Sequence, residues 1–351
     1  MNDATPPAAP RLTSFSHGGG CGCKISPGVL SDILRNASGF PAPAQLLVGI
    51  ESADDAAVWQ LDDERALVAT TDFFMPIVDD PFDFGRIAAV NALSDVYAMG
   101  ARPIMALALV AMPIERLPLE SIRAILAGGE SVCAAAGIPV AGGHTIDSVE
   151  PIYGLVALGL GHPGRIKRND GARPGDRLVL GKPLGVGIMS AALRKEQLPP
   201  EGYAAMIATT TRLNTPGMAL SELEDVHALT DVTGFGLLGH LLEMCRGARV
   251  AARLSMAAVP RMAGVEALIA RGFVTGASAR NWAAYGDAVR LSDDGAQRAL
   301  LTDPQTSGGL LVACAPEALE AVLEAFRRDG FAEACEIGEM VSGEPGVEVQ
   351  A

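Results

Sequence analysis

Residues 84–110 read FGRIAAVNALSDVYAMGARPIMALALV, which is an alanine-rich segment, a glycine and an apolar run. The first part, Phe84–Met99, predicts a buried helix that ends at Gly100, because glycine commonly follows the last helical residue. The apolar run Ile104–Val110 is too short to span a bilayer and predicts a buried strand. A helix followed so closely by a buried strand is typical of proteins that mix α and β structure.

The alternation of strand and helix extends on both sides of this segment. Further strands are predicted at Ala66–Thr70, Pro139–Ala141, Tyr153–Leu160, Arg177–Leu180, His227–Thr230 and Gly309–Cys314, and further helices at Gly187–Arg194, Leu237–Arg246 and Pro316–Arg328. The glycines, prolines and basic residues of Gly161–Gly175 interrupt the pattern and predict a domain boundary. We therefore expect an α/β (α+β) chain with a flexible Gly-rich segment at residues 1–46, an N-terminal domain at 47–161 and a C-terminal α/β domain at 175–345.

Composition limits the classes of function. The 351 residues are 49% hydrophobic and only 5% aromatic, and the formal net charge is −14. A nucleic-acid-binding surface needs a basic face and often stacking aromatics, so we expect no nucleic-acid partner. No secretory signal or membrane-spanning run is visible, so we expect no membrane association and a cytoplasmic location with reduced cysteines. Of the six cysteines, Cys133, Cys245, Cys314 and Cys335 lie in apolar surroundings and are expected to be core residues.

The other two cysteines lie in the most informative segment of the chain, His17–Lys24, which reads HGGGCGCK. A cysteine between glycines sits where the backbone can approach a ligand closely. Lys24, together with His17, is expected to lower the pKa of the Cys21 thiol, and Lys24 can also neutralise a transferring phosphoryl group. Two alternatives are a mobile tail with incidental thiols and a metal site, although no downstream ligand pair for zinc is present. After the loop, Ser26 and Pro27 predict the start of a short helix that continues through Val29 and Ile33.

Carboxylates recur at predicted loops and strand ends. Asp54 and Asp55 precede an apolar run, Asp72 is predicted to end a strand, and Asp231 is predicted to end another. Asp95 lies four residues after Asn91, so both side chains are on one face of the Phe84–Met99 helix. A buried carboxylate needs a partner, and the partner is either a capping group or cation, or a shared Mg²⁺–phosphate site, which we favour.

Two glycine-closed loops are candidate phosphate or site loops. Gly142, Gly143, His144 and Thr145 are predicted to follow a strand, where backbone amides and a hydroxyl can meet phosphate. Residues 303–309 read DPQTSGG and form either a simple turn before a strand or part of a site. Neither a Walker A motif nor a dinucleotide-binding glycine fingerprint in a strand–turn–helix context is present, so a nucleotide site would be of another kind.

Taken together, these segments closely resemble the selenophosphate synthetase (selenide, water dikinase) family. The resemblance rests on HGGGCGCK at 17–24, DDAAV at 54–58, TTDFFMP at 70–76, NALSDVYAMG at 91–100, AGGH at 141–144, TDVTGFG at 230–236 and DPQTSGG at 303–309. The motifs run in family order over nearly the whole chain. The Asp-Asp-Ala-Ala motif is shared with the wider superfamily that includes aminoimidazole ribonucleotide synthetase, whereas the Cys-Gly-Cys-Lys loop is specific to the selenium enzymes.

The resemblance implies the superfamily fold, with N-terminal domains paired into a β-barrel homodimer, and conversion of ATP, selenide and water to selenophosphate, AMP and phosphate. This activated selenium would supply selenocysteine and selenium-modified tRNA synthesis. The resemblance assigns the residues as follows: catalytic, Cys21 and Lys24; ATP-binding, Lys24, Ser52, Ala53, Asp54, Asp72, Asp95, Gly143, His144 and Thr145; Mg²⁺ ligands, Asp55, Asp95 and Asp231. It leaves open whether Cys21 carries selenium covalently.

Two alternatives remain at this stage. The first is another ATP-dependent synthetase or kinase of the same superfamily, although such enzymes have no need of the thiol loop. The second is a non-enzymatic selenium or metal carrier, which would leave the acids and glycine loops unexplained. A selenium-delivery protein is a further expected partner whose identity the sequence does not give.

Overall fold

The structure, a computed structural model, describes residues 11–25, 29, 33, 42–49, 54–292 and 295–351. Its first sheet has six strands in the order β1-β2-β3-β6-β4-β5. All neighbouring pairs are antiparallel except β4 and β5, which are parallel. The strands are β1 (Leu46–Val48), β2 (Ala57–Gln60), β3 (Ala66–Phe74), β4 (Arg102–Met112), β5 (Val140–Asp147) and β6 (Ile152–Gly161).

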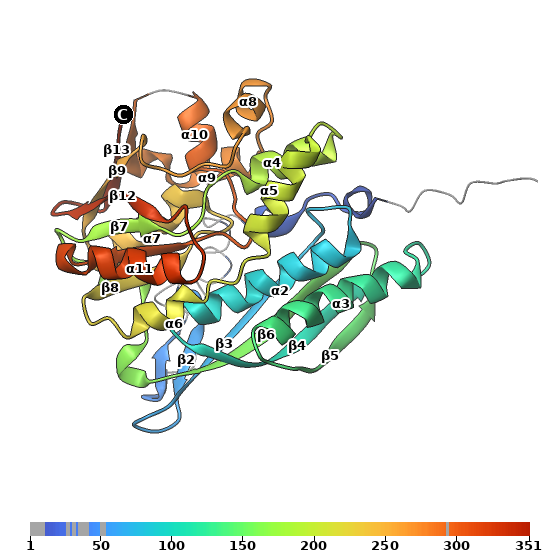
Figure 1. The fold of residues 1–351 in the computed structure, drawn as a ribbon, viewed down its shortest axis with the longest axis horizontal. Coiled ribbons are helices and arrows are strands. Elements are labelled where there is room, and N and C mark those ends of the chain that lie inside the picture. The colour runs from blue at the N-terminus through green and yellow to red at the C-terminus, as the bar shows by residue number, and fades with distance from the viewer. Residues whose placement is uncertain (1–10, 26–28, 30–32, 34–41, 50–53, 293–294) are drawn as a thin grey trace, which may run out of the picture.

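Two helices cover one face of this sheet (Figure 1): α2 (Pro81–Ala98) and α3 (Leu119–Ala135). The side chain of Asp80 caps α2 by accepting a hydrogen bond from the Asp83 amide, and Pro81 occupies its first turn. The helices approach closely at Gly85, where a Cβ atom would lie 1.9 Å from the carbonyl oxygen of Ile125. The contact buries the inner face of α2 and holds Asn91 and Asp95 against the sheet.

The opposite face of the first sheet carries no helix formed by described residues. On β3, β6 and β4, the outward side chains form a continuous apolar surface in the strand register. Phe73 is 52% exposed, and the others are only partly buried: Leu67, Met105, Leu107, Leu109, Val156 and Leu158. The edge strand β5 is also exposed over Ala141–Asp147. An apolar sheet face of this extent is typical of a protein–protein contact surface.

The second sheet has seven strands in the order β10-β13-β9-β12-β7-β11-β8. Helix α7 (Gly236–Ala248) packs on one face and α11 (Leu319–Arg328) on the other, so both faces contribute to the core. The strands are β7 (Arg177–Leu180), β8 (Val226–Asp231), β9 (Ala251–Ser255), β10 (Val289–Leu291), β11 (Leu310–Cys314), β12 (Cys335–Val341) and β13 (Gly346–Gln350). The other helices are α4 (Val186–Arg194), α5 (Pro200–Thr210), α6 (Pro216–Ser221), α8 (Val265–Ala270), α9 (Gly276–Tyr285) and α10 (Gly295–Leu301).

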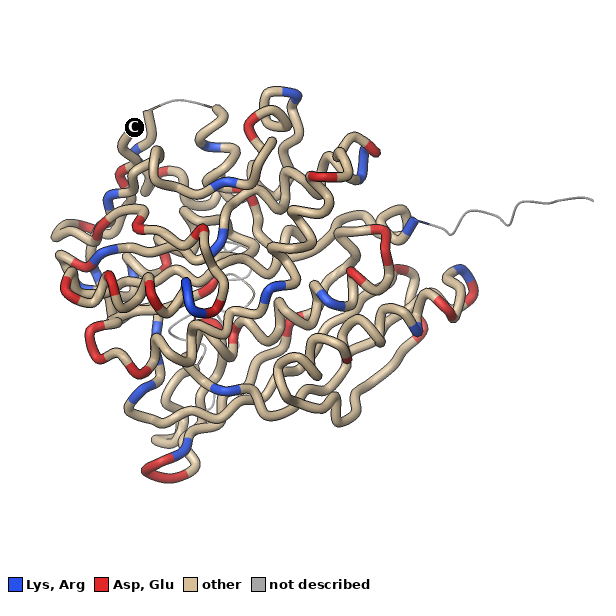
Figure 2. The backbone as a smooth tube through the Cα atoms, in the orientation of Figure 1, with Lys and Arg blue, Asp and Glu red and all other residues tan. Residues whose placement is uncertain are grey.

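The two halves join at α2, whose buried residues belong to the same apolar cluster as those of β7, β8 and α7. Polar contacts cross the same junction, where the Asn214 amide donates to the Ser94 hydroxyl over 2.7 Å. None of the helices built from described residues is long and apolar enough to cross a bilayer. Figure 2 shows Lys and Arg interspersed with Asp and Glu along the chain, without a continuous basic stripe in this view.

The mixed α/β character and most elements predicted from the sequence are confirmed, but two local predictions are wrong. Asp72 does not end its strand, because β3 continues to Phe74. Gly142–Thr145 does not follow a strand but lies inside β5, which runs to Asp147. Glycine has low strand propensity, and here pairing with β4 overrides it. The helix predicted after Ser26 and Pro27 lies outside the described residues except for Val29 and Ile33, which are helical.

Candidate active site

Three carboxylates from three different elements meet between the two halves of the chain. Asp55 precedes β2, Asp95 lies on the last turns of α2, and Asp231 is the last residue of β8. One oxygen from each carboxylate lies within 4.8 Å of the other two. Residues separated by up to 176 positions in the chain thus form one cluster.

A hydroxyl group supports each member of this acidic cluster. Thr230 Oγ1 donates to Asp55 Oδ1 over 2.9 Å, Thr70 donates to Asp95, and Ser94 donates to Asp231. The second oxygen of Asp55 is buried and has no hydrogen-bond partner among the described residues. One donor to each carboxylate orients the group and leaves other lone pairs for a further ligand.

The electrostatics of the cluster favour a bound cation. Burial raises the pKa of Asp55, Asp95 and Asp231, and the charge of Asp231 further raises the pKa of the other two. Two buried carboxylates and the partly buried Asp55 at this separation repel one another when ionised, and an opposite charge relieves that repulsion. Because the donors are hard oxygens and one buried oxygen is unpartnered, the set fits Mg²⁺.

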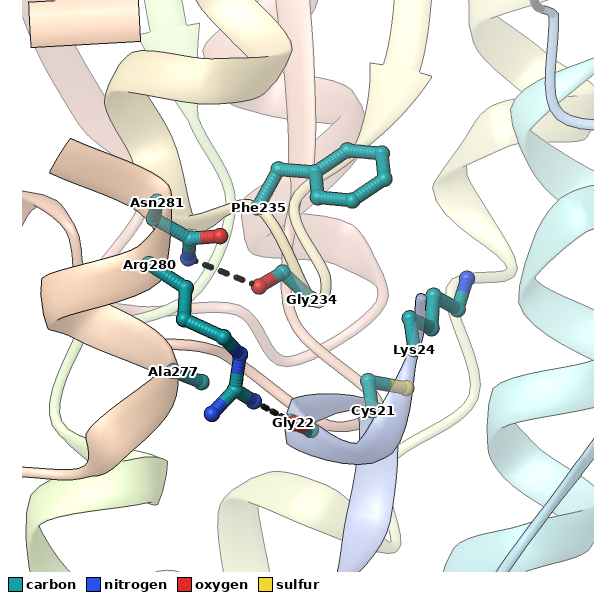
Figure 3. A pocket seen from close by; sticks show the side chains of 8 residues that line it. All are labelled: Cys21, Gly22, Lys24, Gly234, Phe235, Ala277, Arg280 and Asn281. Carbon is teal, nitrogen blue, oxygen red and sulfur yellow. Dashed lines mark hydrogen bonds between the residues drawn. The ribbon is translucent and has the colours of Figure 1, made fainter. Parts of the chain in front are cut away.

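The glycine loop places Cys21 and Lys24 next to each other (Figure 3), and the charge of Asp231 acts on both groups. Lys24 Nζ lies 3.7 Å from Asp72 Oδ2, and the charge of Asp72 is the largest cause of the raised pKa of Lys24. Cys21 Sγ donates to Asn91 Oδ1 over 3.2 Å, and the amide nitrogen of Asn91 donates to Asp72. Asn91 therefore connects the thiol to the same carboxylate that holds the ammonium group.

Cys21 is buried in a 3₁₀ turn, Gly20–Cys23, with 1% of its surface exposed. Burial is the main cause that raises the pKa of its thiol well above the ordinary value, and the charge of Asp72 adds to it. Lys24 lowers the pKa, as predicted, but by less than burial raises it. His17 is not among the main influences on this pKa, and its ring nitrogen pairs with Glu150 Oε2 at 3.0 Å. In this arrangement Cys21 is a neutral thiol.

The 303–309 loop holds the glycine loop in place from the C-terminal half. The Cys21 amide donates to Thr306 Oγ1 over 3.0 Å, and the Ser307 amide donates to Asn91 Oδ1 over 2.7 Å. Beneath the loop, the fully buried Lys182 donates to the Ser307 carbonyl over 2.8 Å. Of the two alternatives left open for this loop, the structure favours part of the site over a simple turn.

Sequence reasoning did not single out several of these supporting residues. Thr70, Ser94 and Thr230 each lie one or two residues from a predicted acid, so a hydroxyl next to a candidate ligand was the available signal. Thr306 and Ser307 gave no comparable signal, because 285 residues separate Thr306 from Cys21.

Other sequence-predicted residues lie away from the acidic cluster. Asp54 faces the segment between the two sheets, where its Oδ1 accepts a hydrogen bond from the Asn169 amide over 2.7 Å. Ser52 and Ala53 lie outside the described residues. Gly143 and Asp72 lie on the same row of the sheet but on strands three positions apart. The row runs from Gly143 on β5 through Ala108 on β4 and Leu155 on β6 to Asp72 on β3. Three strand spacings make this separation about 14 Å, so one chain does not bring Gly143–Thr145 to the cluster.

Two family models match consecutive parts of the chain. Residues 53–161 match "AIR synthase related protein, N-terminal domain", and residues 173–350 match "AIR synthase related protein, C-terminal domain". Curated relatives named "Selenide, water dikinase" align over nearly the full length of both chains. The protein from Burkholderia ambifaria is 69% identical, covering 98% of each chain. That from Dechloromonas aromatica is 61% identical, covering 97% and 98%, and that from Rhizobium meliloti is 58% identical, also covering 97% and 98%.

Solved structures with the same fold are more distant in sequence. Thiamine-monophosphate kinase from Stenotrophomonas maltophilia superposes with a TM-score of 0.64 at 23% identity, covering 88% of this chain and 92% of the other. HypE from E. coli, a hydrogenase maturation protein, gives a TM-score of 0.64 at 20% identity, covering 92% and 94%. At these identities the similarity is evidence for the fold alone.

Proposed function

The chain belongs to the selenide, water dikinase family, and we propose that it performs the family reaction at the site formed by Cys21, Lys24 and the acidic cluster. It is an enzyme that transfers phosphoryl groups from ATP to two acceptors, selenide and water. The products are selenophosphate, AMP and orthophosphate. One phosphoryl group is transferred to selenium, and water takes up the other.

Asp55, Asp95 and Asp231 would hold Mg²⁺, with Asp72 and Lys24 beside the phosphates of ATP. A bound Mg²⁺ neutralises charge on the phosphate oxygens and so makes the phosphorus easier to attack. The hydroxyl groups of Thr70, Ser94 and Thr230 keep the carboxylates oriented, which is the usual role of residues behind metal ligands. This assignment is supported by the unpartnered Asp55 oxygen and by the repulsion among three adjacent carboxylates.

Lys24 carries a positive charge throughout the neutral pH range, because Asp72 raises its pKa. An ammonium group beside the carboxylate cluster can neutralise a phosphoryl group during transfer, when charge on its oxygens is spread. Cys21, as a neutral thiol, positions the loop through Asn91 and Thr306. Direct attack by its thiolate would require the sulfur to leave this buried position and become ionised.

The observation that carries the proposal is the convergence of the loop specific to selenium enzymes on a magnesium-type carboxylate cluster. The test is anaerobic incubation with Mg²⁺-ATP, with and without selenide, followed by ³¹P NMR. Selenide-dependent AMP with a new phosphorus–selenium resonance is the expected result. ADP as the only nucleotide product, or turnover indifferent to selenide, would reassign the chain to another kinase or synthetase of the superfamily.

Lys24→Ala is expected to reduce selenophosphate formation by about 100-fold or more, because removing one preorganised charge from a transfer site costs that much. Arg123→Ala, which removes an exposed positive charge from α3, is the control and should keep selenophosphate formation close to wild type. Circular dichroism checks that both variants are folded. Turnover at the wild-type rate in Lys24→Ala would contradict the role given to Lys24.

We also propose that the protein is a homodimer formed through the bare face of the first sheet. Leu107, Val156 and Leu158 lie in adjacent strands of that face and have no helical cover within the described chain. Covering this face with the same face of a second copy would bury the apolar side chains in a closed, symmetric contact. A β-barrel shared by two six-stranded sheets is the arrangement that the family resemblance implies.

The dimer would also explain the position of Gly143–Thr145. These residues lie on the exposed strand β5, about 14 Å across the sheet from Asp72 by strand spacing. If they contact ATP, the contact comes from the partner subunit, so the nucleotide site is shared between two copies.

A reducing compartment fits the cysteines, since all six are free. We propose the cytoplasm as the location, where thiols remain reduced. Selenium would reach the enzyme as a reduced anion or from a delivery protein.

A further inference from the structure

A second cavity lies beside the glycine loop, away from the acidic cluster. Its volume is about 730 Å³, and its walls come from the loop, the end of α4, the start of α9, and the 303–309 loop. Asp55, Asp72, Asp95 and Asp231 are not part of its walls. The volume falls in the range of natural small-molecule sites.

The charge of this cavity is opposite to that of the whole protein. Its described wall contains Lys24, Arg194, Lys195, Arg280 and His17, and no Asp or Glu. The full chain, by contrast, has 41 acidic and 27 basic side chains. An acid-free, basic wall in an acidic protein attracts small anions and raises their local concentration.

Most of these cations are not neutralised by a carboxylate. Arg194 donates to the carbonyls of Thr13 and Ser16 and feels the charge of Glu150 without a direct ion pair, and Arg280 donates to the Gly22 carbonyl over 2.9 Å. Lys195 forms no ion pair with any carboxylate in the described part of the chain. The positive charge is therefore available to a ligand in the cavity.

A small chamber of about 10 Å³ lies next to this cavity, against the reactive loop. Cys21 lines the chamber, and Gly22, Lys24, Ala277 and Arg280 line both the chamber and the large cavity. Figure 3 shows the Arg280 guanidinium directed at Gly22, next to Cys21. A volume of this size accommodates about one water-sized group. Arg280 therefore lines both the large basic cavity and the small chamber next to the Cys21 thiol.

We propose that the 730 Å³ cavity is the access route for selenium as the hydrogen selenide anion, with Arg194, Lys195 and Arg280 as its attracting groups. The inference rests on the proposed function. Hydrogen selenide is an anion at neutral pH, so the carboxylate side of the loop repels it, whereas Mg²⁺ lets ATP bind there. The two anionic substrates would then reach the loop from different sides and meet at Cys21 and Lys24.

Cys23 gives the cavity a chemical reporter. Cys23 is part of the wall. Burial is the main cause that raises the pKa of its thiol to about 11, Arg194 and Arg280 lower this pKa, and Glu150 raises it to a smaller extent. The field of the two guanidinium groups therefore reaches the sulfur. An anionic alkylating reagent should be drawn to Cys23 more strongly than a neutral reagent of similar size.

The first experiment measures kcat/KM for selenide at saturating Mg²⁺-ATP. Lys195→Glu should lower it about fivefold and leave the KM for ATP unchanged, and the effect should shrink as salt is added. Arg123→Glu reverses an exposed charge on α3 and is the control. Equal kcat/KM values for selenide in Lys195→Glu and Arg123→Glu would overturn the proposal. Wild-type protein that makes no selenophosphate would contradict the proposed function instead.

The second experiment does not depend on catalysis. In a Cys21→Ser background, Cys23 is alkylated with iodoacetate or with iodoacetamide, and the modified peptide is quantified by mass spectrometry. Dividing the iodoacetate rate by the iodoacetamide rate removes the effect of the thiolate fraction, because both reagents react with the same thiolate. If the cavity attracts anions, Lys195→Glu should lower this ratio about threefold. An unchanged ratio in Lys195→Glu would overturn the proposal even if the enzyme is active.

Discussion

The buried lysine below the 303–309 loop shows how a single residue connects stability with the site. Lys182 is 2% exposed, and its ammonium group donates to the carbonyls of Arg212 and Ser307. The ring of Phe331 lies 6.0 Å away, but no carboxylate is paired with the ammonium in the described structure. Burial lowers the pKa of Lys182 to about 7. The 303–309 loop, which holds Cys21, therefore accepts a hydrogen bond from a lysine whose pKa is near neutral.

This gives a pH-dependent stability prediction for Lys182. Above pH 7 the folded protein holds the lysine neutral, whereas the unfolded chain keeps it protonated up to about pH 10. The unfolded state then binds more protons, so the contribution of Lys182 to stability rises with pH. The free energy of unfolding of wild type relative to Lys182→Met should increase by about 1–2 kcal/mol between pH 7 and 8.5.

Urea denaturation at several pH values measures this difference. Lys195→Met, at an exposed position, provides the comparison and should show no such trend. A difference between wild type and Lys182→Met that does not change with pH would mean that Lys182 keeps one protonation state over this range.

At the scale of single residues, the sequence predicted features that depend only on neighbouring positions in the chain. Asn91 and Asp95 were placed on one helix face by their spacing, and the structure has them both on the buried inner face of α2. The pKa of Cys21 could not be predicted, because it depends on burial against residues far away in the chain. The sequence correctly predicted that Lys24 lowers the pKa of Cys21. The larger effect of burial, which raises this pKa, cannot be predicted from neighbouring residues.

At the scale of elements, the glycine loop is held by hydrogen bonds both before the loop and within it. Before the loop, Asp79 accepts hydrogen bonds from the amide and hydroxyl of Thr13 and pairs with Arg11. Within the loop, Thr306 and Arg280 hold Cys21 and Gly22. A segment that the sequence predicted to be flexible is thus ordered over residues 11–25 by contacts with both halves of the chain.

Gly20 is the position where this loop has least room. Its φ is +56°, and a Cβ atom would lie 2.3 Å from Thr306 Oγ1 and 2.4 Å from Ile77 Cγ2. Gly20→Ala should therefore displace the loop and lower kcat about 100-fold, because misplacing reacting groups by about 1 Å has an effect of that size. The buried Cys21 thiol should also react faster with iodoacetamide.

The matched control is Gly137→Ala, at a glycine with φ of +74° and no atom near the added Cβ. It carries similar backbone strain, about 1 kcal/mol, but lies after α3 and away from the loop. Its activity and its rate of Cys21 labelling should match wild type. If Gly20→Ala also keeps wild-type activity, the loop conformation seen in this structure is not the one required for catalysis.

Element boundaries were predicted well where hydrophobic periodicity was strong and poorly where glycine interrupted it. The strand Arg177–Leu180 was predicted at its observed bounds. The strand at Pro139–Ala141 was predicted too short, because the glycines of β5 suggested a loop. Pairing with β4 stabilises this part of β5, and pairing between strands is a tertiary property.

At the scale of the whole molecule, the described part of one chain leaves two features incomplete: an apolar sheet face that no described residue covers, and Gly143–Thr145 far from the acidic cluster. A symmetric dimer through the first sheet would complete both. The sequence contained the apolar residues of β3, β4 and β6, but it did not show which face the helices would cover. That choice depends on the packing of α2 and α3, so the bare face became visible only in the fold.

A shared nucleotide site predicts that two inactive variants restore activity when combined. Asp231→Asn removes a member of the acidic cluster, and Thr145→Glu places a negative charge on the exposed strand β5. Each homodimer should be inactive. In a heterodimer, one site combines the intact cluster of one subunit with the intact β5 of the other, so a randomised mixture should recover about a quarter of wild-type activity.

Subunits are exchanged by mild denaturation and refolding of the two variants together, and selenide-dependent AMP is measured. Adding Leu158→Glu to both variants places a charge in the bare sheet face, and it should abolish the recovery and shift sedimentation toward the monomer. Recovery that survives Leu158→Glu would place the dimer contact elsewhere. No recovery from a mixture shown to contain heterodimers would mean that β5 does not complete the site of its partner. Thr145 would then have no part in ATP binding, because β5 lies three strand spacings from Asp72 within one chain.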